Sequence, residues 1–523
     1  MPVQPLPVSR PTTPRLLVAL ALSLACLGAV ARFWDLGRMV VWHDEVFSVA
    51  RVLGYGAGEA QDALYNAGHV LRPKDLQRFQ TADPSRTWAD TWRALQGHPE
   101  HGPLYYLLAR IGSGLTESAV VGLRGTSAAL SLLLLPAMAW LARELFGRGP
   151  APWIAVALAA VAPIHLLYAQ EARQYAFWSV LVAASSAALL RALRRGGSSD
   201  WALYAGLVAV GLYTHLLMAV TIAIHALYGL WREHRHPTAL RGFALRFAAA
   251  AGTALLLFLP WIIVMLHRFD EMRDYTGWMA APARLDLLVF TWATDLARPF
   301  VDLPGLPLAW LGVMPLLVVA VRHTAHYPER RLLWLLALVP LAMVALPDVF
   351  IGGRRSLESR YLMPSFLALE LFCVGALSSA FTDGGKLRRF ATALLALTVG
   401  AGLVSQGWIL AADTWWTKSY SAKNGAFARR VNSAPHPLIL ASDGAVNVGE
   451  LLSLSYWLQP HVQLLLQSRD APIAIPAGYT DLFALLPGKA LRAQLETDYL
   501  VRPFDGTWQW YVLVPRPPVG DTP

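Results

Sequence analysis

Apolar runs of about 15 to 25 residues recur along most of this sequence, and they limit its fold more than any other feature. A helix of about 20 apolar residues crosses a hydrocarbon core of about 30 Å. Composition agrees, because 55% of the residues are hydrophobic and only 15% are charged, whereas about a quarter of a soluble domain is typically charged. The sequence therefore predicts an α-helical polytopic membrane protein and excludes an ordinary soluble one.

The runs and their flanking charges predict about eleven transmembrane helices. The first run is followed by Arg32 and lacks a small-residue cleavage site, so we expect a retained helix rather than a signal peptide. The predicted spans lie near 15–32, 120–142, 151–169, 174–192, 201–214, 216–231, 244–266, 306–321, 332–347, 361–380 and 390–411.

Basic residues predict the orientation of these spans. With a cytoplasmic N-terminus, the arginines and lysines of successive short loops all fall on the cytoplasmic side, as the positive-inside rule requires. This placement explains the net charge of +10 better than a nucleic-acid surface does. We therefore expect a multi-pass protein of the inner or cytoplasmic membrane, with its site facing the periplasm or exterior. The residues concerned include Arg143, Arg148, Arg191, Arg194, Arg195, Arg232, Arg235, Arg322, Arg330, Arg331, Lys386, Arg388 and Arg389.

The chain is expected to divide into a cytoplasmic tail (1–14), a transmembrane domain (15–411) that includes the outer loop 33–119, and an extracytoplasmic domain (412–523). The last part alternates helical stretches with short strand-like runs, which is typical of a small α/β domain. These runs lie at 437–441, 462–466, 481–486 and 508–514.

Segment 103–115 is apolar but too short to span a membrane. It would also break the alternation of charged loops if it were counted as a span. We expect a helix on the outer surface, with Tyr105 and Tyr106 at the membrane interface.

Two adjacent carboxylates, Asp44 and Glu45, follow the first apolar run. Carboxylates at the edge of a bilayer are costly to desolvate unless they bind something. The functional interpretation is a general base or a metal ligand facing a cavity. The alternative is structural, with Asp44 as the N-cap of a helix that starts at Glu45.

Two histidines and a carboxylate, His98, Glu100 and His101, precede an expected helix start at Pro103. Glu100 and His101 permit a divalent metal site, although their spacing is not diagnostic. The two cysteines, Cys26 and Cys373, lie inside apolar runs and predict neither a disulfide framework nor a cysteine metal site.

Further charges interrupt apolar sequence at Glu171 and Arg173. Either they pair with each other in an ordinary loop, or Glu171 joins Asp44 in one site while Arg173 holds an anion. His215, at the end of another run, is expected to be structural.

A group of arginines precedes the tenth predicted span on the outer side, where topology does not require them. Phosphate recognition is one cause, because guanidinium groups bind phosphate oxygens bidentately, and contact with lipid headgroups is the other. The group comprises Arg354, Arg355 and Arg360, with Glu358 and Tyr361 among them.

If these outer groups converge, the chemistry that suits them is transfer from a lipid-linked phosphate donor. A carboxylate would deprotonate the acceptor hydroxyl while arginine or a metal ion stabilises the departing phosphate. The sequence contains no P-loop or dinucleotide fingerprint, and a donor carried by a lipid needs neither.

The sequence resembles the GT-C superfamily of polyprenyl-phosphate-sugar-dependent glycosyltransferases, near the protein O-mannosyltransferases and the lipid A aminoarabinose transferase. The resemblance covers roughly 15–380 and depends on four motifs in order along the chain. Gly102 departs from the family's His-Pro-Pro-Leu-Tyr-Tyr pattern. The motifs are Asp44-Glu45, His101-Gly102-Pro103-Leu104-Tyr105-Tyr106, Gln170-Glu171-Ala172-Arg173-Gln174-Tyr175, and Arg360-Tyr361-Leu362 followed by Pro364.

The resemblance implies an inverting membrane transferase. Asp44, in the pair with Glu45, would be the catalytic carboxylate, and Glu171 the second acid. Arg173 and Arg360 would bind the donor phosphate, and Glu100 and His101 would contact that phosphate or a metal ion. The implied partners are a polyprenyl-phosphate sugar, membrane lipid, and an acceptor hydroxyl on a glycan, a lipid or a protein.

Two other classes remain open on the sequence alone. A transporter or flippase for lipid-linked sugars would also need a charged cavity, but such proteins usually show pseudo-repeated halves, and no repeat is visible here. A non-catalytic subunit of an envelope assembly complex is the other class, and the presence of both Asp44 and Glu171 argues against it.

Overall fold

The computed structural model describes residues 14–56, 58–468 and 473–517, so nearly all of the predicted tail 1–14 lies outside the described residues. The fold is mostly helical, and its internal contacts divide the chain into two units. The first, here the helical unit, comprises Met1–Asp35, Pro99–Tyr105 and Gly125–Ala411. The second, here the mixed unit, comprises Leu36–His98, Tyr106–Arg124 and Ala412–Pro523. The loop 36–98, which the sequence assigns to the transmembrane domain, thus shares a unit with the C-terminal tail.

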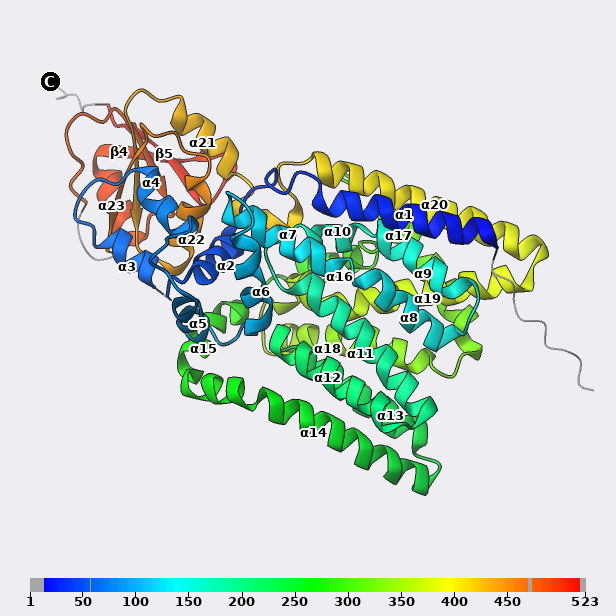
Figure 1. Cartoon of the computed structure of the whole chain (residues 1–523). Coiled ribbons are helices and arrows are strands. Elements are labelled where there is room, and N and C mark those ends of the chain that lie inside the picture. The colour runs from blue at the N-terminus through cyan, green and yellow to red at the C-terminus, as the bar shows by residue number, and fades with distance from the viewer. Residues whose placement is uncertain (1–13, 57, 469–472, 518–523) are drawn as a thin grey trace, which may run out of the picture. The chain divides into compact units, whose positions relative to one another are not determined.

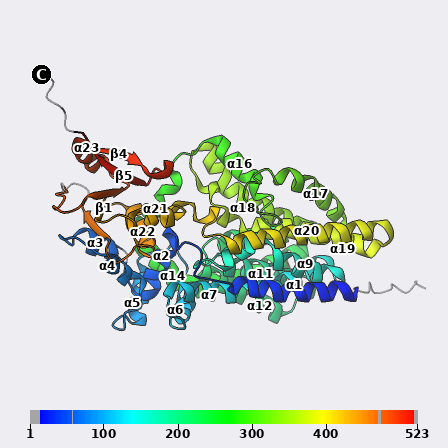
Figure 2. The same cartoon turned by 90° about the horizontal axis from the view of Figure 1, so that it is seen from above.

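Long helices form the helical unit, and α1 and α20 run in a common direction in both views (Figures 1 and 2). Helices α6 (Pro103–Ser113) and α7 (Ala119–Ser131) are divided between the units. The other helices are α1 (Arg15–Phe33), α8 (Leu134–Phe146), α9 (Pro150–Val161), α10 (Pro163–Ala169), α11 (Tyr175–Arg195), α12 (Ser198–Thr214), α13 (Met218–Glu233), α14 (Pro237–His267), α15 (Phe269–Thr276), α16 (Leu285–Asp295), α17 (Trp310–His323), α18 (Arg330–Phe350), α19 (Met363–Asp383) and α20 (Gly385–Ala411), with short 3₁₀ turns η2 (Gly277–Ala280), η3 (Thr324–His326), η4 (Arg355–Leu357) and η5 (Ser359–Leu362).

Each predicted span coincides with one helix or with two consecutive ones, but not every helix is long enough to cross a membrane. Within the described residues, seven helical segments pass the criteria of length and hydropathy, or eight if the pair α9 and α10, bent by 59°, counts as one. The remaining three, α12, α13 and α17, have 17, 16 and 14 residues. At 1.5 Å per residue, the longest of these reaches only about 25 Å.

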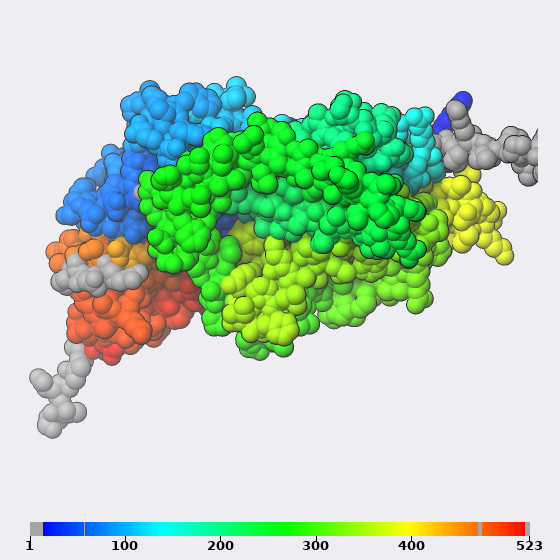
Figure 3. Space-filling model, turned by 90° about the horizontal axis from the view of Figure 1, so that it is seen from below, coloured from blue at the N-terminus to red at the C-terminus, as the bar shows by residue number. Residues whose placement is uncertain are grey.

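The surface of the helical unit is suited to lipid. Figure 3 shows α14, in green, on this surface. The buried residues of α14 recur every three or four positions and so form one stripe, while several of its leucines are exposed. A contiguous exposed apolar face is typical of a helix that contacts lipid rather than water. The exposed leucines are Leu245, Leu255, Leu256, Leu257, Leu259 and Leu266.

The mixed unit is built around a five-stranded sheet in the order β2-β1-β3-β5-β4. Strand β1, inside the sheet, pairs in parallel with β2 and β3, whereas β5 pairs antiparallel with β3 and β4. Four of the strands match the predicted runs, and β4 was not predicted. The strands are β1 (Pro437–Ser442), β2 (Gln463–Gln467), β3 (Asp481–Leu485), β4 (Tyr499–Pro503) and β5 (Trp510–Pro515).

Helices cover the sheet, and the first loop supplies several of the unit's helices. One face packs against α23 through Leu491 and Leu495. On the other face, Phe427 of α21 stacks on Trp510 at 4.2 Å. The helices are α2 (His43–Leu53), α3 (Glu59–Tyr65), α4 (Pro73–Gln77), α5 (Trp88–Gln96), α21 (Asn424–Asn432), α22 (Ala445–Ser455) and α23 (Lys489–Asp498), with 3₁₀ turns η1 (Arg78–Gln80), η6 (Trp416–Ser421) and η7 (Phe504–Gly506).

The first loop also joins the sheet directly. Leu71 forms an antiparallel bridge with Leu464 of β2, with both backbone hydrogen bonds present at 2.7 and 2.9 Å. This bridge, with the helices of the loop, explains why the loop and the tail form one unit.

Tyr105 and Tyr106 of α6 are not at an interface, as the sequence analysis expects, but are fully buried. The hydroxyl of Tyr105 lies 2.7 Å from the Ser127 hydroxyl. Because a buried phenol requires a hydrogen-bond partner, this contact makes an interior position favourable for Tyr105.

Leu440→Ala in strand β1 should lower the free energy of unfolding by about 2–5 kcal/mol, because Leu440 is fully buried between its neighbours and α23 and the substitution leaves a cavity. The matched control is Leu465→Ala in edge strand β2, where the side chain is half-buried. Thermal unfolding of the full chain in detergent measures both. Equal losses in the two variants would contradict the packing described here.

Candidate active site

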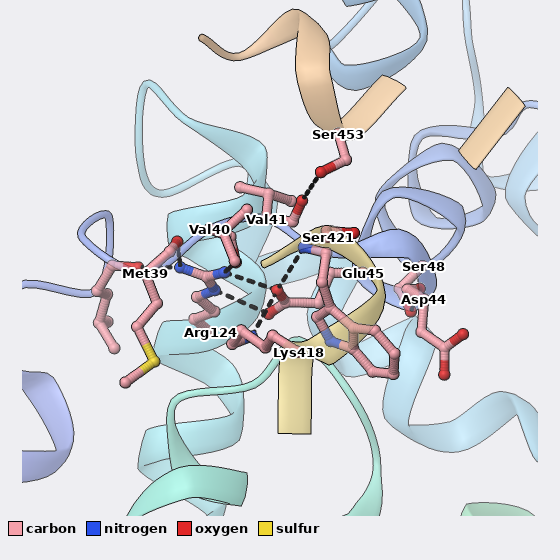
Figure 4. Close-up of polar contacts among 12 residues, drawn as sticks. Met39, Val40, Val41, Asp44, Glu45, Ser48, Arg124, Lys418, Ser421 and Ser453 are labelled. Carbon is pink, nitrogen blue, oxygen red and sulfur yellow. Dashed lines mark hydrogen bonds and ion pairs between the residues drawn. The ribbon is translucent and has the colours of Figure 1, made fainter. Parts of the chain in front are cut away.

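Glu45 is the centre of a buried ionic cluster in the mixed unit (Figure 4). Arg124 donates to both of its oxygens, at 2.8 and 2.6 Å, and Lys418 Nζ lies 2.8 Å from Oε2. Arg124 also donates to the main-chain carbonyls of Leu36, Met39 and Val40. The cluster therefore ties α2, α7 and η6 together.

The cluster makes Glu45 a poor proton acceptor. Burial alone would raise the pKa of this carboxyl, but the charges and hydrogen bonds of Arg124 and Lys418 outweigh it and lower the pKa to about 2. Glu45 also accepts a hydrogen bond from the Trp42 amide, at 3.3 Å, near the start of α2. The structure thus shows Glu45 holding α2, α7 and η6 together, while its predicted part in catalysis stays a prediction.

Asp44 lies next to Glu45 at the start of α2. Figure 4 shows its carboxylate directed away from that of Glu45. Helix α2 begins at His43, with Trp42 as the N-cap residue, so Asp44 is already inside the helix. The alternative prediction, in which Asp44 caps a helix from Glu45, is therefore wrong, and Asp44 is a half-buried carboxylate in the first turn of α2.

In the helical unit, Arg173 and Arg360 meet at the ring of Tyr175. The guanidinium carbons lie 5.7 and 5.8 Å from the ring centroid, although the two arginines are far apart in sequence. Glu171, in the turn between α10 and α11, is buried, and its charge and that of Arg360 both act on Tyr168. The structure thus brings together Glu171, Arg173 and Arg360, which the sequence analysis named separately.

His215 lies beside the two arginines, between α12 and α13. Its ring stacks on Trp178 at 4.6 Å and lies 5.5 Å from Tyr175. Burial, together with the charges of Arg173 and Arg360, lowers the pKa of His215 to about 3. The ring is therefore neutral at neutral pH, and because Nδ1 accepts a hydrogen bond from the Leu217 amide, the proton is on Nε2.

Asp295 and Arg298 form a second ion pair, which is hydrogen-bonded to the turn that carries Arg360. Ser359 donates to Asp295 Oδ1 at 2.8 Å, and Arg298 bonds both Ser359 and Asp295. Burial raises the pKa of Asp295 to about 6, against the opposing charge of Arg298. Arg360 itself lies 3.1 Å from Glu358. Sequence analysis did not name Arg298 or Asp295, although both stand among apolar residues in an expected outer loop.

Arg355 is used within the fold. It lies 3.0 Å from Asp348, whose other oxygen accepts hydrogen bonds from the amide and the hydroxyl of Ser356. Arg360 of the same group instead lies with Arg173 at the ring of Tyr175.

Glu100 and His101 form a pair in the helical unit, with His101 Nε2 3.6 Å from Glu100 Oε1. Among the described residues, no group of three or more histidine, cysteine, aspartate or glutamate side chains is arranged to hold a metal ion. Two ligands fall short of the usual three or four protein ligands of a zinc site. A divalent metal ion at Glu100 and His101 therefore stays a prediction.

Gly102 follows this pair, and its departure from the family motif has a steric cause. A Cβ at Gly102 would clash with the backbone carbonyl of Tyr213, and it would lie 2.9 Å from the Thr214 carbonyl carbon. The backbone that carries Glu100 and His101 therefore packs directly on the end of α12, next to His215.

The Glu45→Gln variant should be less stable than the wild type by about 3 kcal/mol at pH 7, because Arg124 and Lys418 lose their buried counter-charge. A folded-state pKa near 2, below the ordinary value of 4.5, stabilises the fold above that ordinary value, and the contribution is lost as the pH falls through 2. Unfolding in detergent from pH 7 to pH 3 should show the two proteins converging below about pH 4.5. A difference that does not vary with pH would contradict this account.

Gly102→Ala should lower the free energy of unfolding by about 1–3 kcal/mol, since the added methyl group meets backbone atoms that cannot rotate away. The control is Gly252→Ala, in α14, where a Cβ meets nothing within 4 Å. Alanine is the better helix former, so this control should be neutral or slightly stabilising. Similar melting temperatures for the two variants would count against the close packing at Gly102.

Comparison with known proteins agrees with these features. The family model described as dolichyl-phosphate-mannose-protein mannosyltransferase matches residues 98–264, which include Glu100, His101, Glu171, Arg173 and His215. No curated protein sequence matches the chain significantly.

Among solved structures, the chain is similar to ArnT from Cupriavidus metallidurans bound to undecaprenyl phosphate, with a TM-score of 0.52 and 14% identity over 95% of this chain and 97% of that one. The apo state of the same ArnT has a TM-score of 0.53 to this chain, with the same identity and coverage. The oligosaccharyltransferase AglB from Archaeoglobus fulgidus, in complex with an inhibitory peptide and a dolichol-phosphate, gives only 0.46 at 11% identity, over 95% of this chain and 74% of that one. The chain therefore shares its fold with ArnT along nearly the whole of both chains, and the family match covers about a third of it, residues 98–264.

Proposed function

We propose that this protein transfers a sugar, a hexose or a pentose, from a polyprenyl-phosphate donor to an acceptor hydroxyl, with inversion at the anomeric carbon. The observation that carries the proposal is the convergence of Arg173 and Arg360 on Tyr175, with the acid Glu171 in the same turn as Arg173. Two guanidinium groups at one place are suited to an anion with several oxygens, and phosphate is the anion that a lipid-linked sugar carries.

The arginine pair would act on the leaving group. As the bond between the anomeric carbon and the phosphate oxygen breaks, the electron pair stays on that oxygen, and the polyprenyl phosphate gains negative charge. Arg173 and Arg360 would stabilise this charge more strongly in the transition state than in the bound donor. The Nε2–H of neutral His215 offers a further hydrogen-bond donor next to them, and Glu171 would hold the arginines in place as the second acid of the site.

Asp44 would act as the general base. It would accept the proton of the acceptor hydroxyl while the acceptor oxygen attacks the anomeric carbon from the side opposite the phosphate, which inverts the configuration. Glu45 cannot share this task, because Arg124 and Lys418 hold its carboxylate ionised and hydrogen-bonded. Glu45 would instead fix the start of α2, from which Asp44 projects.

The ligand of the ArnT structure supports the class of donor. That protein holds undecaprenyl phosphate, and we propose a lipid phosphate of the same class here. The acceptor would be a hydroxyl group on a glycan, a lipid or a protein at the periplasmic or outer face of the cytoplasmic membrane. His101, beside the end of α12, would contact the donor phosphate as a hydrogen-bond donor.

Asp44→Asn should reduce release of free polyprenyl phosphate from a short-chain polyprenyl-phosphate sugar by about 100-fold or more, because the acceptor hydroxyl loses its base. The assay uses the full chain in detergent, at matched folded yield, with each class of acceptor supplied in turn. The control is Asp62→Asn, which changes an exposed carboxylate of the same loop and should leave release unchanged.

Full release by Asp44→Asn would refute the assignment of the base. If the wild type binds radiolabelled donor, with dependence on Arg360, but turns over none with any acceptor class, the result would favour a transporter or an assembly subunit over a transferase.

A further inference from the structure

The helix that leads into the Glu171 turn is broken inside the helical unit. Helix α9 ends at Val161, and α10 begins at Pro163 after a bend of 59°. Proline has no amide hydrogen, so the carbonyl of Ala159 loses the donor that a continuous helix would provide. In a membrane-spanning segment, such a carbonyl requires another partner.

Two other helices supply these partners. Arg32 of α1 donates to the carbonyls of Ala159 and Ala160, at 3.1 and 3.3 Å, and Gln406 of α20 donates to Ala160 at 3.1 Å. Gly28 of α1 allows this approach, since a Cβ there would lie 2.6 Å from the Ala160 carbonyl oxygen. The break is therefore built into the packing of α1 and α20 and is not a local irregularity.

The far end of α10 is held as well. The side-chain amide of Gln170, at the C-cap, donates to the carbonyls of Ala31 and Trp34, both at 2.9 Å. These acceptors lie at the end of α1, where helix carbonyls have no partner within the helix. Helix α10 has only seven residues and would be marginal alone, so contacts such as these determine its position.

A buried histidine and glutamate lie between these two anchors. His165 of α10 and Glu370 of α19 are 3% and 0% exposed, and His165 Nε2 lies 2.8 Å from Glu370 Oε1. The charge of Arg32 interacts with Glu370, so three helices share this group. Ionisable side chains at such positions are expensive and are usually retained for a function.

The two helices joined by this contact carry the two halves of the arginine pair. Helix α10 runs directly into the turn with Glu171 and Arg173, and α19 begins directly after the turn with Arg360. We propose that His165 and Glu370 are positioning residues, which set the Glu171–Arg173 turn against Arg360 through the buried contact between α10 and α19. The inference rests on the proposed function, because it assigns these residues a task in placing the arginines around the donor phosphate.

The test uses the single variants His165→Gln and Glu370→Gln, together with the double variant His165→Leu/Glu370→Leu. Each single variant leaves a buried polar group without its counterpart, whereas the double variant removes both and should recover most of the lost stability. The matched control is His225→Gln, because His225 is another buried histidine, and its polar partners, Ser186 and Tyr204, lie in α11 and α12.

Two measurements separate positioning from stability. We expect kcat for donor release to fall at least about tenfold in both single variants and in the double variant, with KM for the lipid donor changed less than about threefold, because a displacement of about 1 Å is costly to the chemical step. Hydrogen exchange of the 170–174 amides, read by mass spectrometry, should accelerate at least about tenfold in the same three variants and not in His225→Gln.

If the double variant regains wild-type kcat together with its stability, or if exchange of the 170–174 amides is unchanged, the positioning role is refuted. If the wild type releases no polyprenyl phosphate but exchange responds as expected, the proposed function fails while the positioning of the turn stands.

Discussion

The mixed unit depends on one buried carboxylate. Glu45 receives two hydrogen bonds from Arg124 and one from Lys418, and these residues come from three separate segments of the chain. Removing one partner of a buried ion pair costs far more than the pair contributes over an apolar substitute, because the remaining charge is left without compensation. The start of α2, from which Asp44 projects, is therefore held in place by Glu45 and its two partners.

In the helical unit, buried polar side chains likewise bind the backbone, and there they stabilise the break between α9 and α10. Pro163 interrupts the helix, and Arg32 and Gln406 bind the carbonyls that it leaves without donors. After the interruption, α10 leads into the buried turn that contains Glu171 and Arg173, and Arg173 and Arg360 both lie beside the ring of Tyr175. In both units, a buried charge that binds the backbone sets the position of a group that would contact substrate.

Patterns local in sequence predicted much of this structure. Runs of apolar residues gave the positions of the long helices, and four short β-prone runs gave four of the five strands. Strand β4 was not predicted because it lies at the edge of the sheet, is only partly buried and has no apolar alternation that distinguishes it from a loop. The motif residues Glu171, Arg173 and Arg360 could be named from sequence, and only the fold could show that two of them share the ring of Tyr175.

Partners distant in sequence could not be predicted. Arg124 is 79 residues from Glu45, and Lys418 is 373 residues away, so nothing near Glu45 distinguishes it from Asp44 as a candidate base. The burial of Tyr105 likewise depends on Ser127, and the role of His215 depends on Trp178 and on the two arginines. Each of these contacts forms between residues that come together only when the helices pack, so the sequence near either partner does not predict it.

The bridge between Leu71 and β2 has a consequence for how the chain is made. The first loop is synthesised long before the tail, and domains generally fold as they emerge. This loop cannot do so, because its bridge partner Leu464 and the counter-charge Lys418 belong to segments that are translated near the end. Until then Glu45 stays in water and the loop has no sheet to join, so the nascent chain carries an unfinished loop through the insertion of nearly all of its membrane helices. The fold of the first loop is therefore completed only after the tail has been synthesised.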